Sequence, residues 1–107
     1  MDKRRPAIHF VERVDHLERL EPSGDLWESG NWVLSEKTAE ALLGGWLFLH
    51  RSQSKASHFG GLIVGYRVLG EGESDAGRLV IRFRPDKSCK GVFAGPDGWG
   101  QEKKLEL

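Results

Sequence analysis

Two histidines flank a serine-rich loop in the middle of the chain, and they are the side chains most suited to chemistry. His50 and His58 lie eight residues apart, and the serines between them could form a Ser–His pair of the kind that hydrolases use. Such loops also commonly do no more than hydrogen-bond their own backbone. The spacing does not match the usual patterns of zinc ligands, and Cys89 has no histidine partner at a recognisable spacing. We therefore expect a passive thiol, no metal and no cofactor, and keep a small hydrolase using the 50–58 loop as an alternative.

Aromatic residues give the chain a second kind of chemistry, the stacking of a nucleic-acid base. Stacking on an aromatic side chain contributes roughly 1–3 kcal/mol per base, and nearby polar groups can then read the base edge. The competing interpretation is that tryptophans in so small a domain belong to the core. The candidates are Trp27, Trp32, Phe59 and Trp99 as stacking faces, with Ser52, Gln53 and His58 as polar contacts.

Basic residues near the same loop could hold a phosphate backbone. Arg51, Lys55 and Arg67 are the candidates. The alternative is a solvated strand face whose arginines pair with acids of the 70–77 segment, and it is favoured by the charge balance of 16 basic and 16 acidic residues. A net charge of zero provides no long-range attraction to nucleic acid or to anionic membranes. Any nucleic-acid contact must therefore be local.

The length and composition indicate one domain spanning residues 1–107, with residues 1–6 flexible. A chain of this length supports a single hydrophobic core. The lone cysteine is compatible with a reducing compartment, and no apolar run is long enough to cross a bilayer. We expect a cytoplasmic protein with no membrane partner; the sequence leaves the oligomeric state open.

The elements that must position these residues are mostly strands. One principal helix is expected over residues 36–43, because Ser35 is a good N-cap and two glycines end the segment. Apolar runs predict buried strands over 46–50 and 59–69, with a bulge at Gly65, and alternation predicts a strand over 78–84. Shorter strands are expected over 32–34, 91–94 and within 99–107. Residues 7–20 fit either a helix or a strand, and the β-branched residues favour a strand over 7–14.

Several of these motifs, in this order, resemble the PUA-like superfamily, and within it the EVE and ASCH domains. The motifs are Trp32-Val-Leu-Ser-Glu36, the helix, Leu43-Gly-Gly45, the strand ending in His50-Arg-Ser52, and Leu62-Ile-Val-Gly-Tyr-Arg-Val68. Trp46 stands where EVE domains have an aspartate, and Leu49 where they have a tyrosine. The resemblance implies a pseudo-barrel of five or six mostly antiparallel strands and a reader of RNA or of modified DNA bases. By position, Trp32, Ser35, His50 and Ser52 would match the EVE pattern and line its pocket.

Taken together, the sequence predicts a β-rich α+β domain of PUA-like architecture that acts as a non-catalytic binding module. We expect its pocket between the 27–35 segment and the 50–59 loop, holding a base of RNA or of modified DNA. The alternative outside enzymology is a protein-interaction or regulatory subunit that uses exposed tryptophan and arginine, the residue types that dominate interface hot spots.

Overall fold

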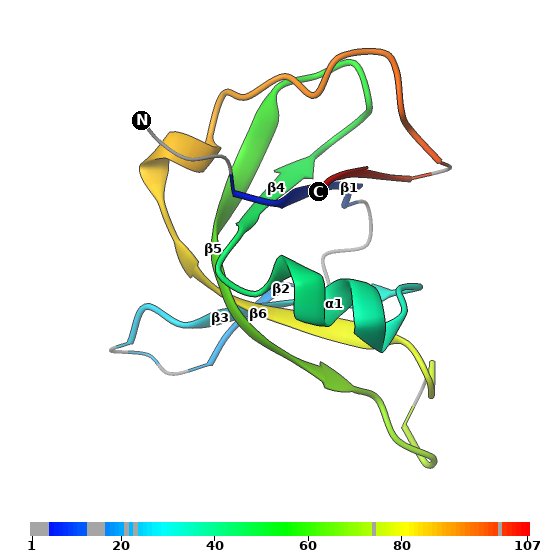
Figure 1. Ribbon diagram of the computed structural model, residues 1–107. Helices are drawn as coiled ribbons and strands as arrows, with labels where there is room; N and C mark the ends of the chain where they lie inside the picture. The colour runs from blue at the N-terminus through cyan, green and yellow to red at the C-terminus, as the bar shows by residue number, and fades with distance from the viewer. Residues whose placement is uncertain (1–4, 13–16, 21, 23, 74, 101) are drawn as a thin grey trace.

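The computed structural model describes residues 5–12, 17–20, 22, 24–73, 75–100 and 102–107 and shows a β-rich α+β fold (Figure 1). Its one α-helix, α1 (Glu36–Leu42), is accompanied by a short 3₁₀ helix, η1 (Lys87–Cys89). The strands are β1 (Ala7–Val11), β2 (Leu17–Arg19), β3 (Trp27–Trp32), β4 (Trp46–His50), β5 (Ser57–Val68), β6 (Leu79–Pro85) and β7 (Lys103–Glu106). No helix in the described part of the chain is long and apolar enough to span a membrane.

All seven strands belong to one mixed sheet in the order β2-β3-β6-β5-β4-β1-β7. Among the described strands, only β1 and β4 pair in parallel; the other neighbours are antiparallel. The long strand β5 bends as it pairs with both β4 and β6, and the register shifts between Ile63 and Gly65 where a bulge was expected (Figure 1). The curved sheet is a small pseudo-barrel, with one strand more than the upper estimate from sequence.

The core fills the concave side of this sheet. Ile8 and Phe10 of β1, Leu47 and Leu49 of β4 and the alternating apolar residues of β6 are buried together with two helix residues, Ala39 and Leu42. The helix begins where Ser35 accepts a hydrogen bond from the Thr38 amide at 3.1 Å. It ends before Gly44, whose φ of 82° favours glycine. The expected helix is confirmed to within one residue.

Close backbone approaches explain the paired glycines Gly60 and Gly61 within β5. A Cβ atom at Gly60 would collide with the carbonyl oxygen of Leu47, and one at Gly61 with the carbonyl oxygen of Arg84. These glycines let β5 pass tightly between β4 and β6. The strand expected over 59–69 begins two residues earlier, at Ser57, so Gly60 and Gly61 lie inside it rather than at its entry.

Of two short strands expected from the sequence, one lies earlier in the chain and the other is absent. The first of these strands occupies Trp27–Trp32, and residues 33–34 lie outside the sheet. Its pairing with β6 overrides the composition of Ser29 and Gly30, which is typical of a loop. Residues 91–94 form an irregular segment, whose Val92 amide donates to the Ser57 hydroxyl at 3.0 Å.

The expected strands at both ends of the chain are present in shortened form. The 7–14 strand is β1, and residues 13–14 lie outside the described part of the chain. The 99–107 strand is β7. Of the six residues expected to be flexible, residues 1–4 are also outside the described part, and the Pro6 carbonyl accepts from the Trp46 amide at 2.9 Å.

Candidate functional site

The β4–β5 loop and the segment before β7 line an open cavity of about 420 Å³. We call it the Trp99 pocket; its lining residues are Gln53, Ser54, Phe93, Gly95, Pro96 and Trp99. The structure thus brings together two of the predicted site residues, Gln53 and Trp99. The walls are largely aromatic and apolar, and a volume of this size accommodates a small planar ligand.

Several contacts fix the indole of Trp99 in place. Its Nε1 donates to the Gly95 carbonyl at 3.0 Å. The rings of His50 and His9 lie steeply inclined to it, with centroids 5.8 Å and 6.3 Å away. The Lys104 ammonium donates to the Ala94 carbonyl and so ties the segment that carries Trp99 to β7. The aromatic wall of the pocket is therefore held before any ligand arrives.

Behind Trp99 the two histidines form a buried hydrogen-bonded chain. His50 Nδ1 lies 2.8 Å from the Lys55 carbonyl, and His50 Nε2 lies 2.8 Å from His9 Nδ1. Because a carbonyl can only accept, His50 Nδ1 donates; the neutral His50 ring then accepts through Nε2 from His9 Nδ1. His50 is fully buried, so it positions the loop and Trp99 rather than touching a ligand.

At the far end of this hydrogen-bonded chain, the contact between His9 and Glu106 requires a further proton on His9 Nε2. His9 Nε2 faces a carboxylate oxygen of Glu106 at 3.3 Å, and two lone pairs cannot form a hydrogen bond. Burial lowers the pKa of His9 below its ordinary value of 6.5; Glu106 opposes the shift, whereas His50 and Lys104 add to it. Protonation of His9, and with it the His9–Glu106 ion pair, therefore requires a lower pH than an ordinary histidine needs.

Three of the four predicted stacking residues, Trp27, Trp32 and Phe59, lie in packing clusters and do not line the Trp99 pocket. Trp32 stacks on Phe10 with ring centroids 3.8 Å apart, and its Nε1 donates to the Ser29 hydroxyl at 3.0 Å. Trp27 packs edge-on against Phe59 at 5.1 Å. The expected pocket between the 27–35 segment and the 50–59 loop is occupied at this contact by the two side chains themselves.

The remaining polar candidates have structural partners or lie beside the pocket. The Ser35 side chain caps α1. Ser52 Oγ lies 3.4 Å from Ser54 Oγ and so adjoins the Trp99 pocket. His58 is partly buried on β5 and does not line that pocket. Both ring nitrogens of His50 are engaged by His9 and Lys55, so the structure forms no Ser–His pair at His50.

The cysteine is placed as a structural thiol. Cys89 is buried, and burial raises its pKa to about 11, with a further contribution from Asp86. In the described part of the chain, no three His, Cys, Asp or Glu side chains are grouped so that they could hold a metal ion.

The three cations predicted to bind a phosphate backbone lie in two separate parts of the structure. Arg51 and Lys55 are exposed on the loop that carries Gln53 and Ser54. Arg67 instead binds the buried carboxylate of Glu28 through Nε and Nη2, at 3.3 Å and 3.4 Å, and pairs with Glu73 at 3.6 Å. The solvated-face interpretation thus describes Arg67, although its main partner is a strand residue.

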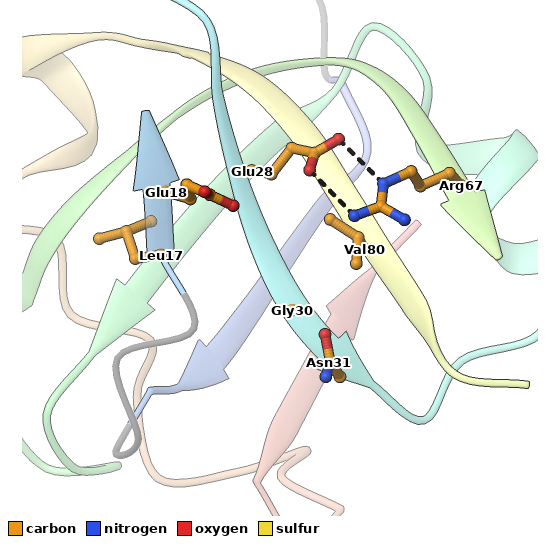
Figure 2. A pocket seen from close by; sticks show the side chains of 7 residues that line it. All are labelled: Leu17, Glu18, Glu28, Gly30, Asn31, Arg67 and Val80. Atoms are coloured by element: carbon orange, nitrogen blue, oxygen red, sulfur yellow. Dashed lines mark hydrogen bonds and ion pairs between the residues drawn. The ribbon is translucent and has the colours of Figure 1, made fainter. Parts of the chain in front are cut away.

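Arg67 and Glu28 line a second cavity of about 400 Å³ on another part of the sheet. We call it the Glu28 cavity; its lining residues are Leu17, Glu18, Glu28, Gly30, Asn31, Arg67 and Val80 (Figure 2).

Sequence reasoning missed three residues that shape these sites. His9 stands in the middle of the apolar run that forms β1 and was not singled out. A histidine at the centre of a buried strand needs a polar partner on a neighbouring strand, which could have identified it. Phe93 is 69% exposed, and a large aromatic residue between glycines and a proline could have marked a binding loop. Glu28 stands beside Trp27, and nothing in the sequence separates it from an ordinary surface acid.

Comparison with known proteins gives no relative for this chain. Neither a family model, a curated protein nor a solved structure matches it. The function must therefore be argued from the geometry alone.

Proposed function

We propose that the protein is a binding module that holds one unpaired nucleic-acid base in the Trp99 pocket. The observation that carries the proposal is the fixed indole of Trp99 in the wall of a 420 Å³ cavity that also contains Phe93 and Gln53. A preformed aromatic wall favours a planar ligand, because little ordering entropy is lost when the ligand stacks.

The polar residues at and beside the pocket can hydrogen-bond the edge of a base and bind the phosphate next to it. A glutamine side chain both donates and accepts, which lets Gln53 pair with the edge of a neutral base, and the Ser54 hydroxyl does the same with less geometric constraint. Arg51 and Lys55 flank these residues on the loop and provide charges for the adjoining phosphate. With two such contacts, binding to a single strand should fall by less than about tenfold between 50 and 200 mM salt.

The test is a fluorescence titration with single-stranded RNA and DNA tetramers of each base, including modified cytosines. Trp99→Ala should reduce affinity about fivefold or more, the scale of one lost stacking interaction, whereas Trp99→Phe retains most of the affinity. Lys55→Ala should weaken all sequences equally, and Gln53→Ala should reduce discrimination between bases. Equal affinity of the native protein and Trp99→Ala for every oligonucleotide would exclude the proposal.

A further inference from the structure

The Glu28 cavity has no part in the proposed base site and carries a different ligand chemistry. It lies where β2, β3, β5 and β6 meet, and Figure 2 shows Arg67 and Glu28 facing each other across β6 with Glu18 beside them on β2. Gly30 and Asn31 of β3 line the other end (Figure 2). The cavity is thus built on paired strands rather than on loops.

A buried carboxylate forms one wall of the cavity. The Glu28 side chain is 6% exposed and holds two guanidinium groups, of Arg67 and of Arg82. The contacts are unequal: Oε2 accepts three N–H groups at 2.8–3.3 Å, whereas Oε1 accepts one, from Arg67 Nη2 at 3.4 Å, among the described residues. A carboxylate oxygen has two lone pairs, so this buried oxygen retains acceptor capacity.

Both side chains that bring donors to the cavity make contacts within the protein. Arg67 directs Nε and Nη2 to Glu28 and Nη1 to Glu73. Asn31 donates from Nδ2 to Asp75 at 3.1 Å, which leaves its side-chain carbonyl as an acceptor. The cavity thus offers a ligand three acceptors: Oε1 of Glu28, the Asn31 carbonyl and the exposed carboxylate of Glu18.

The charges around the cavity also favour a cation. Glu18 lies directly opposite Glu28 in the β2–β3 register, and like charges at such a position repel. Both arginines bind Glu28, and no cation of the described residues pairs with Glu18. With Glu73, which pairs with Arg67, and Asp75, which accepts from Asn31, the groups at or beside the cavity include four carboxylates and two guanidinium groups.

The floor of the cavity is apolar and is kept open by a glycine. Leu17 and Val80 supply aliphatic surface. A Cβ atom at Gly30 would lie 2.9 Å from Cγ2 of Val80, so a side chain there would displace the floor. The hollow therefore offers an aliphatic surface that leads to carboxylate and carbonyl acceptors.

We propose that the Glu28 cavity binds an alkylammonium or alkylguanidinium group, with the aliphatic stem on Leu17 and Val80 and the cationic head donating to Glu18 and to Oε1 of Glu28. Long basic chains pair an apolar stem with a charged head in this way. A free diamine and a lysine or arginine side chain of a peptide share this chemistry. The site is independent of base binding in the Trp99 pocket.

The test is a ¹H–¹⁵N NMR titration of the native chain with agmatine and putrescine at low salt, with 1,4-butanediol and acetate as uncharged and anionic controls. The amines should shift the amides of residues 17–18, 28–31, 67 and 80 saturably, and the controls should not. Glu18→Gln removes an exposed charge from the mouth and should weaken amine binding about fivefold, the range of one exposed ion pair. Glu71→Gln, which makes the same charge change in the exposed 70–77 connection, should leave the affinity unchanged.

Capped peptides Gly-Lys-Gly and Gly-Arg-Gly distinguish the two sources of the cation. Binding at least tenfold tighter than agmatine, with added shifts along the edge strand β2, assigns the site to a peptide; equal or weaker binding assigns it to a free amine. Gly30→Ala, checked for folding by its NMR spectrum, should weaken whichever ligand binds. Unsaturable shifts with every amine, or equal affinities in Glu18→Gln and the native protein, overturn the proposal.

Discussion

Replacing Trp32 by alanine should destabilise the fold and leave the Trp99 pocket intact. Trp32 stacks on the buried ring of Phe10 at 3.8 Å and donates to Ser29, a residue with no exposed surface. Tryptophan-to-alanine changes in cores cost about 3–5 kcal/mol, and the partial exposure of Trp32 places it near 3 kcal/mol, stacking included. The Ser29 hydroxyl, left without its donor, adds about 1 kcal/mol. The expected loss is about 3–4 kcal/mol.

Urea denaturation followed by far-ultraviolet circular dichroism measures this loss. Trp32→Phe is the matched control, because it retains an aromatic ring on Phe10 and loses only the hydrogen bond; it should cost about 1–2 kcal/mol. The loss expected for Trp32→Ala is a large part of the free energy of unfolding of a small domain. A Trp32→Ala protein that keeps its stability within about 1 kcal/mol but no longer binds oligonucleotides would refute the core assignment.

Three further predictions test the packing and the titrating groups. Cys89 should resist iodoacetamide in the native protein at pH 8, because its pKa of about 11 leaves almost no thiolate, and should react in urea; mass spectrometry decides. Gly61→Ala should lower the free energy of unfolding by more than about 2 kcal/mol, since its Cβ would collide with the Arg84 carbonyl; unchanged urea curves would contradict this. Because the pKa of His9 is lower in the folded protein than in the unfolded chain, the neutral His9 ring contributes stability above pH 6.5, and this contribution is lost as the pH falls through the folded pKa. Unfolding curves of His9→Gln should lack this pH dependence.

Local patterns in the sequence predicted the regular elements well. The Ser35 cap and the glycines after the helix fixed α1, and the alternation of Leu79, Ile81 and Phe83 gave β6 its buried face. Each of these signals acts within a few residues, which is why a single sequence reveals it. The strand at Trp27–Trp32 was displaced in the prediction because its pairing with β6 depends on a partner some fifty residues away.

The arrangement of the site depended on contacts that no local pattern reveals. Gln53 and Trp99 were both predicted, but the sequence assigned them to the same pocket as Trp27 and Trp32, which turn out to pack against Phe59 and Phe10. Tertiary packing decides whether a tryptophan belongs to the hydrophobic core or to the wall of a binding pocket. The pairing of Arg67 with Glu28 likewise follows from the order of β3, β6 and β5, which the sequence did not specify.

The most direct measurement of base binding is a search for intermolecular nuclear Overhauser effects between the indole of Trp99 and a bound single-stranded tetramer. The expected result is saturable binding, with cross-peaks from the Trp99 ring to the aromatic protons of one base and further cross-peaks to Phe93. Saturable binding with cross-peaks confined to other residues, or no binding by any RNA or DNA tetramer, would contradict the assignment of the Trp99 pocket as a base site.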